Sequence, residues 1–255
     1  MYFDKFCRAH ARKKIKKKKR MDRRALETGT IHELPQEIQT KWFDSANNGV
    51  FGRMGVNGEG SCFFHSVLTI LNPNDFINLS EDKQIKIANK FRSSFSKRFT
   101  LNEFRILTEK TDEKDGTVLR GRGGEAKKKR DLHKSFKDAQ KAFCDPKVWA
   151  DETNIRLVSK LLNLNLVFVD FSKKSDVYCT MHGDEALKNL EECDPVHELQ
   201  KTGIIAWIDR SHFEPIVRID SVKTGEITAL FDPNLERDAN FLLHFMKTYK
   251  KECNL

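Results

Sequence analysis

The chain lacks any apolar run long enough to cross a membrane, because no stretch of about 18 apolar residues occurs in its sequence. The charged residues near its start are not followed by the apolar segment that a secretory signal requires. Cysteine is sparse, with six positions spread from Cys7 to Cys253 and no dense framework. We therefore expect a soluble intracellular protein, in the cytoplasm or the nucleus, with no membrane contact and no structural disulfide.

Acidic residues are nearly absent from the start of the chain. Residues 1–24 carry 12 Lys or Arg and two Asp, whereas the remainder carries 34 basic and 35 acidic side chains. The net charge of +9 therefore belongs to an N-terminal arm, residues 1–30, which we expect to be disordered. Residues 12–24 predict weak, non-specific nucleic-acid binding or a nuclear localisation signal, unless they form only a solvated tail.

A glycine-rich turn precedes a cysteine within residues 58–66, GEGSCFFHS. Gly58 and Gly60 can adopt positive backbone torsions, and the apolar stretch that follows predicts a helix with Cys62 at its start. A helix N-terminus favours the thiolate, which is the reactive form of cysteine. The amides of Gly60, Ser61 and Cys62 are candidate oxyanion donors. The alternative is a buried structural cysteine.

A second polar pattern begins at His212, which opens the alternating run HFEPIVRI. Alternate side chains of a strand share one face, so His212 and Glu214 are expected to project together. A carboxylate on one imidazole nitrogen fixes the tautomer, while the other nitrogen takes the proton of a thiol. The pattern predicts a triad of Cys62, His212 and Glu214, with no metal or cofactor. His65, one helical turn past the cysteine, is interpreted as a packing or surface residue.

Residues 59–66, EGSCFFHS, resemble the nucleophile motif of the ovarian tumour (OTU) family of cysteine proteases, which usually reads Asp-Gly-Asn/Ser-Cys-Leu/Phe-Phe. Two further blocks, residues 148–169 and 206–216, follow in the family's order. The pairing of CFFHS with HFEP resembles the OTU-like proteins of large DNA viruses. Glu59 stands where the family usually has Asp, and Glu214 stands where it commonly has Asp or Asn.

The resemblance covers about residues 48–222 and implies a papain-like α+β fold, a small, mostly antiparallel sheet flanked by helices. It implies that Cys62, His212 and Glu214 hydrolyse the bond after the C-terminal glycine of ubiquitin or a ubiquitin-like protein, with Glu59 at the catalytic site. Such a glycine suits a narrow channel that Trp207 could line, whereas Trp149 is expected to pack in the core.

The remaining sequence predicts the scaffold. Expected helices follow Pro35, span 80–107, end near Leu162 after start signals at Pro146 and Asp151, and cover 241–249; expected strands are 164–171, 203–208, 212–219 and 226–231. The last three strands are expected to form an antiparallel meander. Residues 110–131 have too little apolar content to pack and are expected to be a mobile insertion. Residues 223–255 are expected to add a strand and a helix that docks on the core or binds a partner.

Two motifs lie outside this scheme. Cys179, His182, Cys193 and His197 have the spacing C-x2-H-x10-C-x3-H, which could bind one zinc ion, although the amphipathic segment between them needs no metal. Residues 119–124, LRGRGG, resemble the C-terminal tail of ubiquitin. This loop could occupy the chain's own active site or be cleaved after its last glycine.

Two other functions remain open from the sequence. The same thiol chemistry serves papain-like hydrolases or acyl transferases of other specificity, in which Asp232 or Asn234 could orient His212 in place of Glu214. A non-catalytic module that binds a partner, with nucleic acid on its basic arm, is the alternative outside enzymes.

Overall fold

The computed structural model describes residues 15–16, 24–58, 60–105, 125–170, 179–182, 200–208, 211–221 and 224–253. In this part of the chain a mixed sheet runs in the order β1-β2-β3-β7-β6-β4-β5, with β8 paired to β7 and β9 paired to β6. Only β1 with β2 and β4 with β6 pair in parallel among the described strands. The expected α+β class with a mostly antiparallel sheet is confirmed.

The strands are β1 (Ile15–Lys16), β2 (Ile31–Glu33), β3 (Val50–Met54), β4 (Asn165–Val169), β5 (Cys179–His182), β6 (Thr202–Ile208), β7 (His212–Ser221), β8 (Glu226–Thr228) and β9 (Leu230–Phe231). The helices are α2 (Gln36–Phe43), α3 (Ser45–Asn48), α4 (Cys62–Leu71), α5 (Pro73–Phe76), α6 (Glu81–Arg98), α8 (Glu125–Cys144), α9 (Glu152–Leu162) and α10 (Glu236–Cys253). No described helix is both long and apolar enough to span a bilayer.

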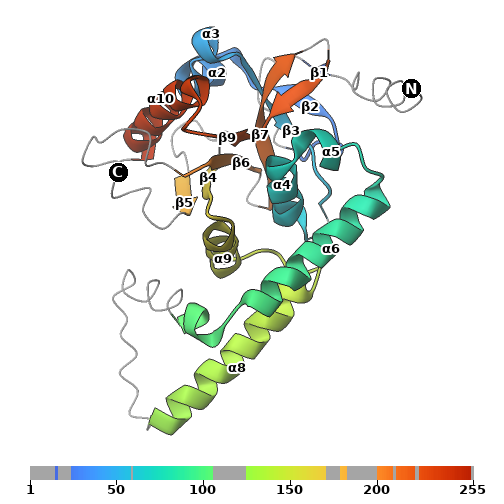
Figure 1. The fold of residues 1–255 in the computed structure, drawn as a ribbon, viewed down its shortest axis with the longest axis vertical. Coiled ribbons are helices and arrows are strands. Elements are labelled where there is room, and N and C mark those ends of the chain that lie inside the picture. The colour runs from blue at the N-terminus through green and yellow to red at the C-terminus, as the bar shows by residue number, and fades with distance from the viewer. Residues whose placement is uncertain are drawn as a thin grey trace.

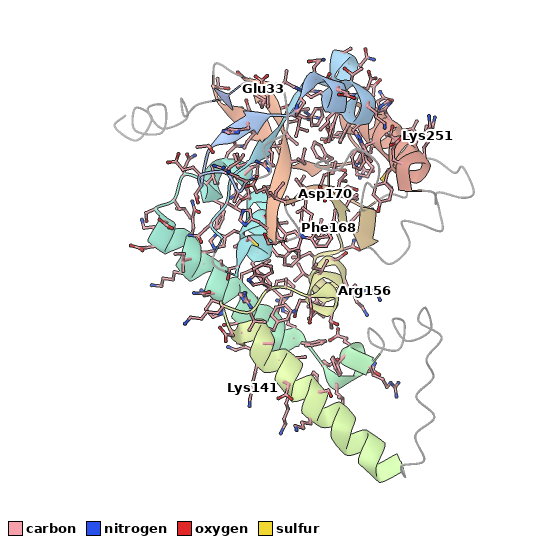
Figure 2. The ribbon with its side chains drawn as sticks, turned by 180° about the vertical axis from the view of Figure 1, so that it is seen from behind. Glu33, Lys141, Arg156, Phe168, Asp170 and Lys251 are labelled. Carbon is pink, nitrogen blue, oxygen red and sulfur yellow. The ribbon has the colours of Figure 1, made fainter. Side chains whose placement is uncertain are left out.

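Helices cover both faces of the sheet (Figure 1). Alternate side chains of a strand point to opposite faces. Leu166 and Phe168 of β4 pack in one cluster with residues of α4, α6, α8 and α9, whereas Val167 and Val169 pack in a second cluster with residues of α2 and α10. Figure 2 shows Phe168 inside the molecule, while Lys141 and Lys251 extend from the outer helices. Burial on both faces explains why β4 is continuously apolar.

The start of the chain departs from the prediction. Leu26 is buried, and the amides of Gly29 and Gly55 each donate across the segment, to the carbonyls of Gly55 and Thr30 at 2.9 Å. The expected disordered arm over residues 1–30 is therefore wrong for residues 24–30, since the basic run ends at Arg24 and an apolar residue follows. Ile31 lies in β2, before Pro35 and the helix α2 that follows it. Most of residues 1–23 lie outside the described part.

The expected insertion at 110–131 ends in a helix, because α8 begins at Glu125. The low apolar content of the segment, on which the prediction rested, does not exclude a helix. Helices α6 and α8 lie side by side and project away from the sheet (Figure 1). Residues 106–124, including the LRGRGG motif, lie outside the described residues.

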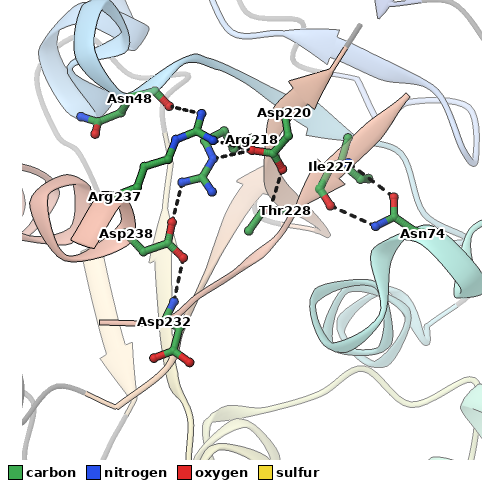
Figure 3. Close-up of polar contacts among 9 residues, drawn as sticks. All are labelled: Asn48, Asn74, Arg218, Asp220, Ile227, Thr228, Asp232, Arg237 and Asp238. Atoms are coloured by element: carbon green, nitrogen blue, oxygen red, sulfur yellow. Dashed lines mark hydrogen bonds and ion pairs between the residues drawn. The ribbon is translucent and has the colours of Figure 1, made fainter. Parts of the chain in front are cut away.

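The meander at the end of the chain is confirmed in part. Strands β6, β7 and β8 follow one another antiparallel, but the third predicted strand divides, because Leu230 and Phe231 return to pair with β6. Figure 3 shows the polar contacts that attach α10 to β7, in which Arg218 donates to Asp220 and Asp238. The apolar face of α10, with Phe241 and Phe245 fully buried, confirms that this helix docks on the core.

Candidate active site

Cys62 is the first residue of α4 and carries a free thiol that is 5% exposed. Its helix begins where predicted, because the Ser61 carbonyl accepts the first intrahelical hydrogen bond, from the His65 amide at 3.0 Å. The hydroxyl of Ser66 donates to the Phe213 carbonyl at 3.0 Å, which ties α4 to β7. Phe63 packs against Phe213 as well. These contacts hold Cys62 of α4 next to the start of β7, where His212 lies.

His212 and Glu214 project together from β7, as the alternation predicted. The His212 Nε2 atom lies 3.4 Å from Glu214 Oε1, a close charge pair that is longer than an ordinary hydrogen bond. The other side of the ring faces the turn before Cys62, because a Cβ added at Gly58 would lie 3.9 Å from Nδ1. Nε2 is therefore the nitrogen that faces the Glu214 carboxylate, and Nδ1 is the nitrogen on the side of the turn that leads to Cys62.

The charge state of His212 follows from these neighbours. Burial lowers its pKa, but interactions with the Cys62 sulfur and the Glu214 carboxylate raise it by more, to about 9. His212 is thus an imidazolium at neutral pH. A cation beside a cysteine sulfur is the arrangement in which a thiol acts as a nucleophile, so the site has the geometry of a cysteine–histidine pair.

Glu214 is fully buried, and its charge is compensated by groups that the sequence did not reveal. Arg53 Nε lies 2.7 Å from Oε2, and the Leu26 amide donates to Oε1 at 2.6 Å. Arg53 also donates from Nη2 to the Arg24 carbonyl at 2.9 Å. Residues 24–26, expected to belong to a disordered arm, therefore help to hold the acid of the predicted triad.

The turn before the nucleophile is tightly constrained. Gly60 has φ +79°, and a Cβ there would lie 2.7 Å from the Pro146 carbonyl oxygen, so only glycine fits. Gly58 does not adopt a positive φ, contrary to expectation. The Ser61 amide donates to the Gly58 carbonyl at 2.9 Å, so it is not the oxyanion donor predicted for it. Glu59 lies outside the described residues.

The Cys62 amide remains a candidate oxyanion donor. It belongs to the first turn of α4, where N–H groups have no acceptor within the helix and point along its axis toward the N-terminus. The role of the Gly60 amide as an oxyanion donor stays a prediction.

The two tryptophans differ in exposure, and the expectation for one of them is overturned. Trp149 is 53% exposed, so the prediction that it packs in the core is wrong. It follows the Asp145–Val148 turn, which packs against the nucleophile turn on one side and faces solvent on the other. Trp207 of β6 is half-buried, lies opposite Phe213 and stacks on it with ring centroids 6.1 Å apart. Its role toward a substrate stays a prediction.

The alternative orienting residues are far from His212. Asp232 follows β9, which pairs with the beginning of β6 at Thr202, whereas His212 pairs with the end of β6 at Ile208. Six residues of strand separate the two ends, about 20 Å. Asp232 instead pairs with Lys201, and Asn234 donates to Asp232. Neither can replace Glu214.

His65 is a packing residue, as predicted. It is 1% exposed, and burial lowers its pKa to about 4, so it is neutral at physiological pH. The zinc motif is not tested, because Cys193 and His197 lie outside the described residues. Within the described part, no group of three or more His, Cys, Asp or Glu residues could hold a metal ion.

No protein-family model matches the chain, and no curated protein matches it. Solved structures do match. An ovarian tumour domain in complex with ubiquitin is 13% identical, with a TM-score of 0.43, and the match covers 80% of this chain and 88% of that one. The Hazara virus OTU bound to ubiquitin is 17% identical, with a TM-score of 0.39, over 67% of this chain and 83% of that one.

A third match, the viral OTU domain protease from Farallon virus, is 14% identical, with a TM-score of 0.38, over 67% of this chain and 86% of that one. All three solved structures are OTU domains. Similarity at this level concerns the fold alone.

Proposed function

We propose that the chain is a cysteine hydrolase that cleaves the bond after the C-terminal glycine of ubiquitin or a ubiquitin-like protein. The observation that carries the proposal is the arrangement of Cys62, His212 and Glu214, in which a buried carboxylate and a sulfur flank one imidazolium. The preference for ubiquitin rests on the resemblance of residues 59–66 to the OTU nucleophile motif.

Each group of the site has a defined part in the reaction. The Cys62 thiolate adds to the carbonyl carbon of the terminal glycine, and the Cys62 amide donates to the oxyanion that forms. The His212 imidazolium gives its proton to the leaving amine as the carbon–nitrogen bond breaks. The neutral imidazole then takes a proton from water, which attacks the thioester and releases the carboxylate and the thiolate. Glu214 fixes the tautomer and orientation of His212 throughout.

The geometry also serves a thiol hydrolase or acyl transferase of another specificity, because nothing in the triad selects the acyl group. A glycine-containing tail would need side chains that narrow the channel beside the sulfur. We propose Trp207 as the residue that lines this channel, since it lies on β6 beside the start of β7.

The proposal is tested by incubating the purified full chain with ubiquitin that carries a thiol-reactive group at its C-terminus. We expect a mass increase of one ubiquitin for the wild type, and none for Cys62→Ala. His212→Ala should react at least about tenfold more slowly, because the thiolate loses its counterion. Asn234→Ala, a control in the loop after β9, should react like the wild type.

Other outcomes identify the alternatives. A folded wild type that reacts with iodoacetamide at Cys62 but not with the ubiquitin probe would favour another acyl substrate. A folded wild type that reacts with neither would overturn the enzyme proposal and favour a binding module. The basic residues 12–24 stay a predicted nucleic-acid contact in either case.

A further inference from the structure

Arg92 of α6 is a buried arginine that the triad does not include. Its side chain is 1% exposed and lies over the ring of Phe64, with Cζ 4.5 Å from the ring centroid. Burial of a guanidinium is costly unless its N–H groups are hydrogen-bonded. Where those N–H groups point therefore shows what the residue does.

The Arg92 donors reach three separate parts of the chain. Nε donates to the Phe143 carbonyl at 2.8 Å, and Nη2 donates to the Ala142 carbonyl at 3.1 Å, both at the end of α8. Nη2 also donates to the carbonyls of Asp145 and Val148, at 3.0 Å for the latter, in the turn that follows α8.

The third part is the nucleophile turn. Nη1 donates to the Ser61 hydroxyl at 3.1 Å and to the Gly60 carbonyl at 3.4 Å. The Ser61 hydroxyl in turn donates to the Pro146 carbonyl at 3.2 Å. One side chain therefore joins the turn before Cys62 to the turn that carries Trp149, across the close approach of Gly60 to Pro146.

The contact with Gly60 bears on catalysis through the backbone. A peptide plane is rigid, so a held Gly60 carbonyl also fixes the Ser61 amide, which donates to Gly58. The next peptide carries the Cys62 amide and leads into α4. Each acceptor of Arg92 named above is an uncharged oxygen. Burial lowers the pKa of Arg92, while electrostatic interactions with Asp145, Cys144 and Cys62, in that order, raise it. Part of the positive charge therefore acts on the Cys62 sulfur, although the Asp145 carboxylate interacts with it more strongly.

We propose that Arg92 is a positioning residue of the active site, which holds the nucleophile turn against the Asp145–Val148 turn and stabilises the thiolate of Cys62. The inference rests on the proposed role of Cys62 as the nucleophile. It does not depend on ubiquitin being the substrate.

The test is the rate at which iodoacetamide alkylates Cys62 in the full chain between pH 5 and pH 10, followed by mass spectrometry of the peptide that contains this residue. Peptide-level detection is needed because Cys144 is an exposed free thiol and the chain contains six cysteines. Since alkylation needs no ubiquitin, its result is separable from the outcome of the ubiquitin-probe experiment.

We expect Arg92→Met to slow alkylation of Cys62 about tenfold at pH 7 and to move the inflection of the pH profile upward, as loss of one nearby charge does. Arg92→Lys keeps the charge but not the planar set of donors, so we expect a loss of about threefold. The matched control is Arg218→Met, which removes another buried arginine, 5% exposed and held by Asp238 of α10. Its pH profile should match the wild type within about twofold.

Ser61→Ala is a second variant that tests the proposal even if Arg92→Met does not fold. It breaks the link from Arg92 through the Ser61 hydroxyl to Pro146 without leaving a buried charge unpaired. We expect alkylation about threefold slower than in the wild type, with the same direction of pH shift. The proposal is overturned if Ser61→Ala keeps the wild-type profile, if a folded Arg92→Met does so, or if Arg218→Met shifts the profile as far as Arg92→Met.

Discussion

Arg53 and Glu214 form a buried ion pair, with Nε and Oε2 2.7 Å apart and side-chain exposures of 2% and 0%. The same carboxylate approaches His212 through its other oxygen at 3.4 Å. An isolated carboxylate at this depth would take up a proton rather than stay charged. Arg53 therefore compensates the buried carboxylate of Glu214 beside His212, and β3 becomes part of the site although no motif lies on it.

Replacing Arg53 by Met should both destabilise the protein and impair the site. The change leaves the Glu214 carboxylate buried without its partner, so we expect the free energy of unfolding in urea to fall by about 3–5 kcal/mol. The double variant Arg53→Met with Glu214→Gln removes both charges and should recover most of that loss without recovering activity. Equal instability of the single and double variants would contradict the role assigned to the pair.

Glu214→Gln alone should lower the rate of hydrolysis. An amide oxygen still accepts a hydrogen bond from the ring but carries no charge, so the change removes one of the interactions that raise the pKa of His212. We expect kcat/KM to fall about tenfold to a hundredfold, measured with a fluorogenic ubiquitin C-terminal substrate. Asn234→Ala should retain full activity, and the reverse pattern would assign the orienting role to the loop after β9.

The pKa of His212, about 9, sets the alkaline limit of activity. The leaving amine needs the imidazolium proton, so kcat/KM should fall as the pH rises through about 9. The raised pKa of His212 also contributes to the stability of the folded state. This contribution is fully present at pH values below 6.5, the pKa in the unfolded state, and is lost as the pH rises through about 9. Titration of the His212 ring by NMR checks the value, and Cys62→Ala should lower it. A midpoint near 6.5 in the wild type would refute the interaction of His212 with Cys62 and Glu214.

Gly60→Ala should disable the site through the backbone. Alanine at φ +79° is strained, and its Cβ would meet the Pro146 carbonyl oxygen at 2.7 Å. We expect a loss of stability of about 1–3 kcal/mol and a loss of Cys62 alkylation greater than tenfold. Gly58→Ala is the matched control, because an added methyl there would make only ordinary contacts at 3.8 Å. If Gly60→Ala keeps the stability and the alkylation rate of the wild type, the turn tolerates a side chain and the constraint on Gly60 is refuted.

The sequence predicted which residues come together at the candidate site, because their signals are local. A glycine-rich turn before an apolar helix places Cys62, and the period of a strand places His212 with Glu214. Asp151 as the cap of α9, with its carboxylate 2.8 Å from the Asn154 amide, was found in the same way. In each case residues close in the chain carry the information.

The groups that support these residues were not predicted, because their roles arise from contacts between distant segments. Arg53 and Arg92 resemble solvated charges in the sequence, since the neighbours that bury them come from other elements. Only the helix face shared by Arg92, Ala88 and Phe95 offered a local signal of burial. Trp149 was misjudged for the same reason, because the density of apolar neighbours around a loop residue cannot be read from its own segment.

The attachment of α10 provides a prediction that separates buried from exposed charge pairs within one network. Arg218 is held by Asp238 at 2.6 Å and by Asp220 at 2.9 Å, whereas the nearby Arg237, half exposed, reaches Asp220 at 3.1 Å. Arg218→Met leaves a buried Asp238 unpaired, so we expect the free energy of unfolding in urea to fall by about 3 kcal/mol. Arg237→Met removes an exposed pair and should cost at most about 1 kcal/mol. Because these residues lie away from Cys62, a folded Arg218→Met variant should show the wild-type pH profile of Cys62 alkylation. Equal losses in the free energy of unfolding for the two variants would show that α10 is held by its apolar face alone.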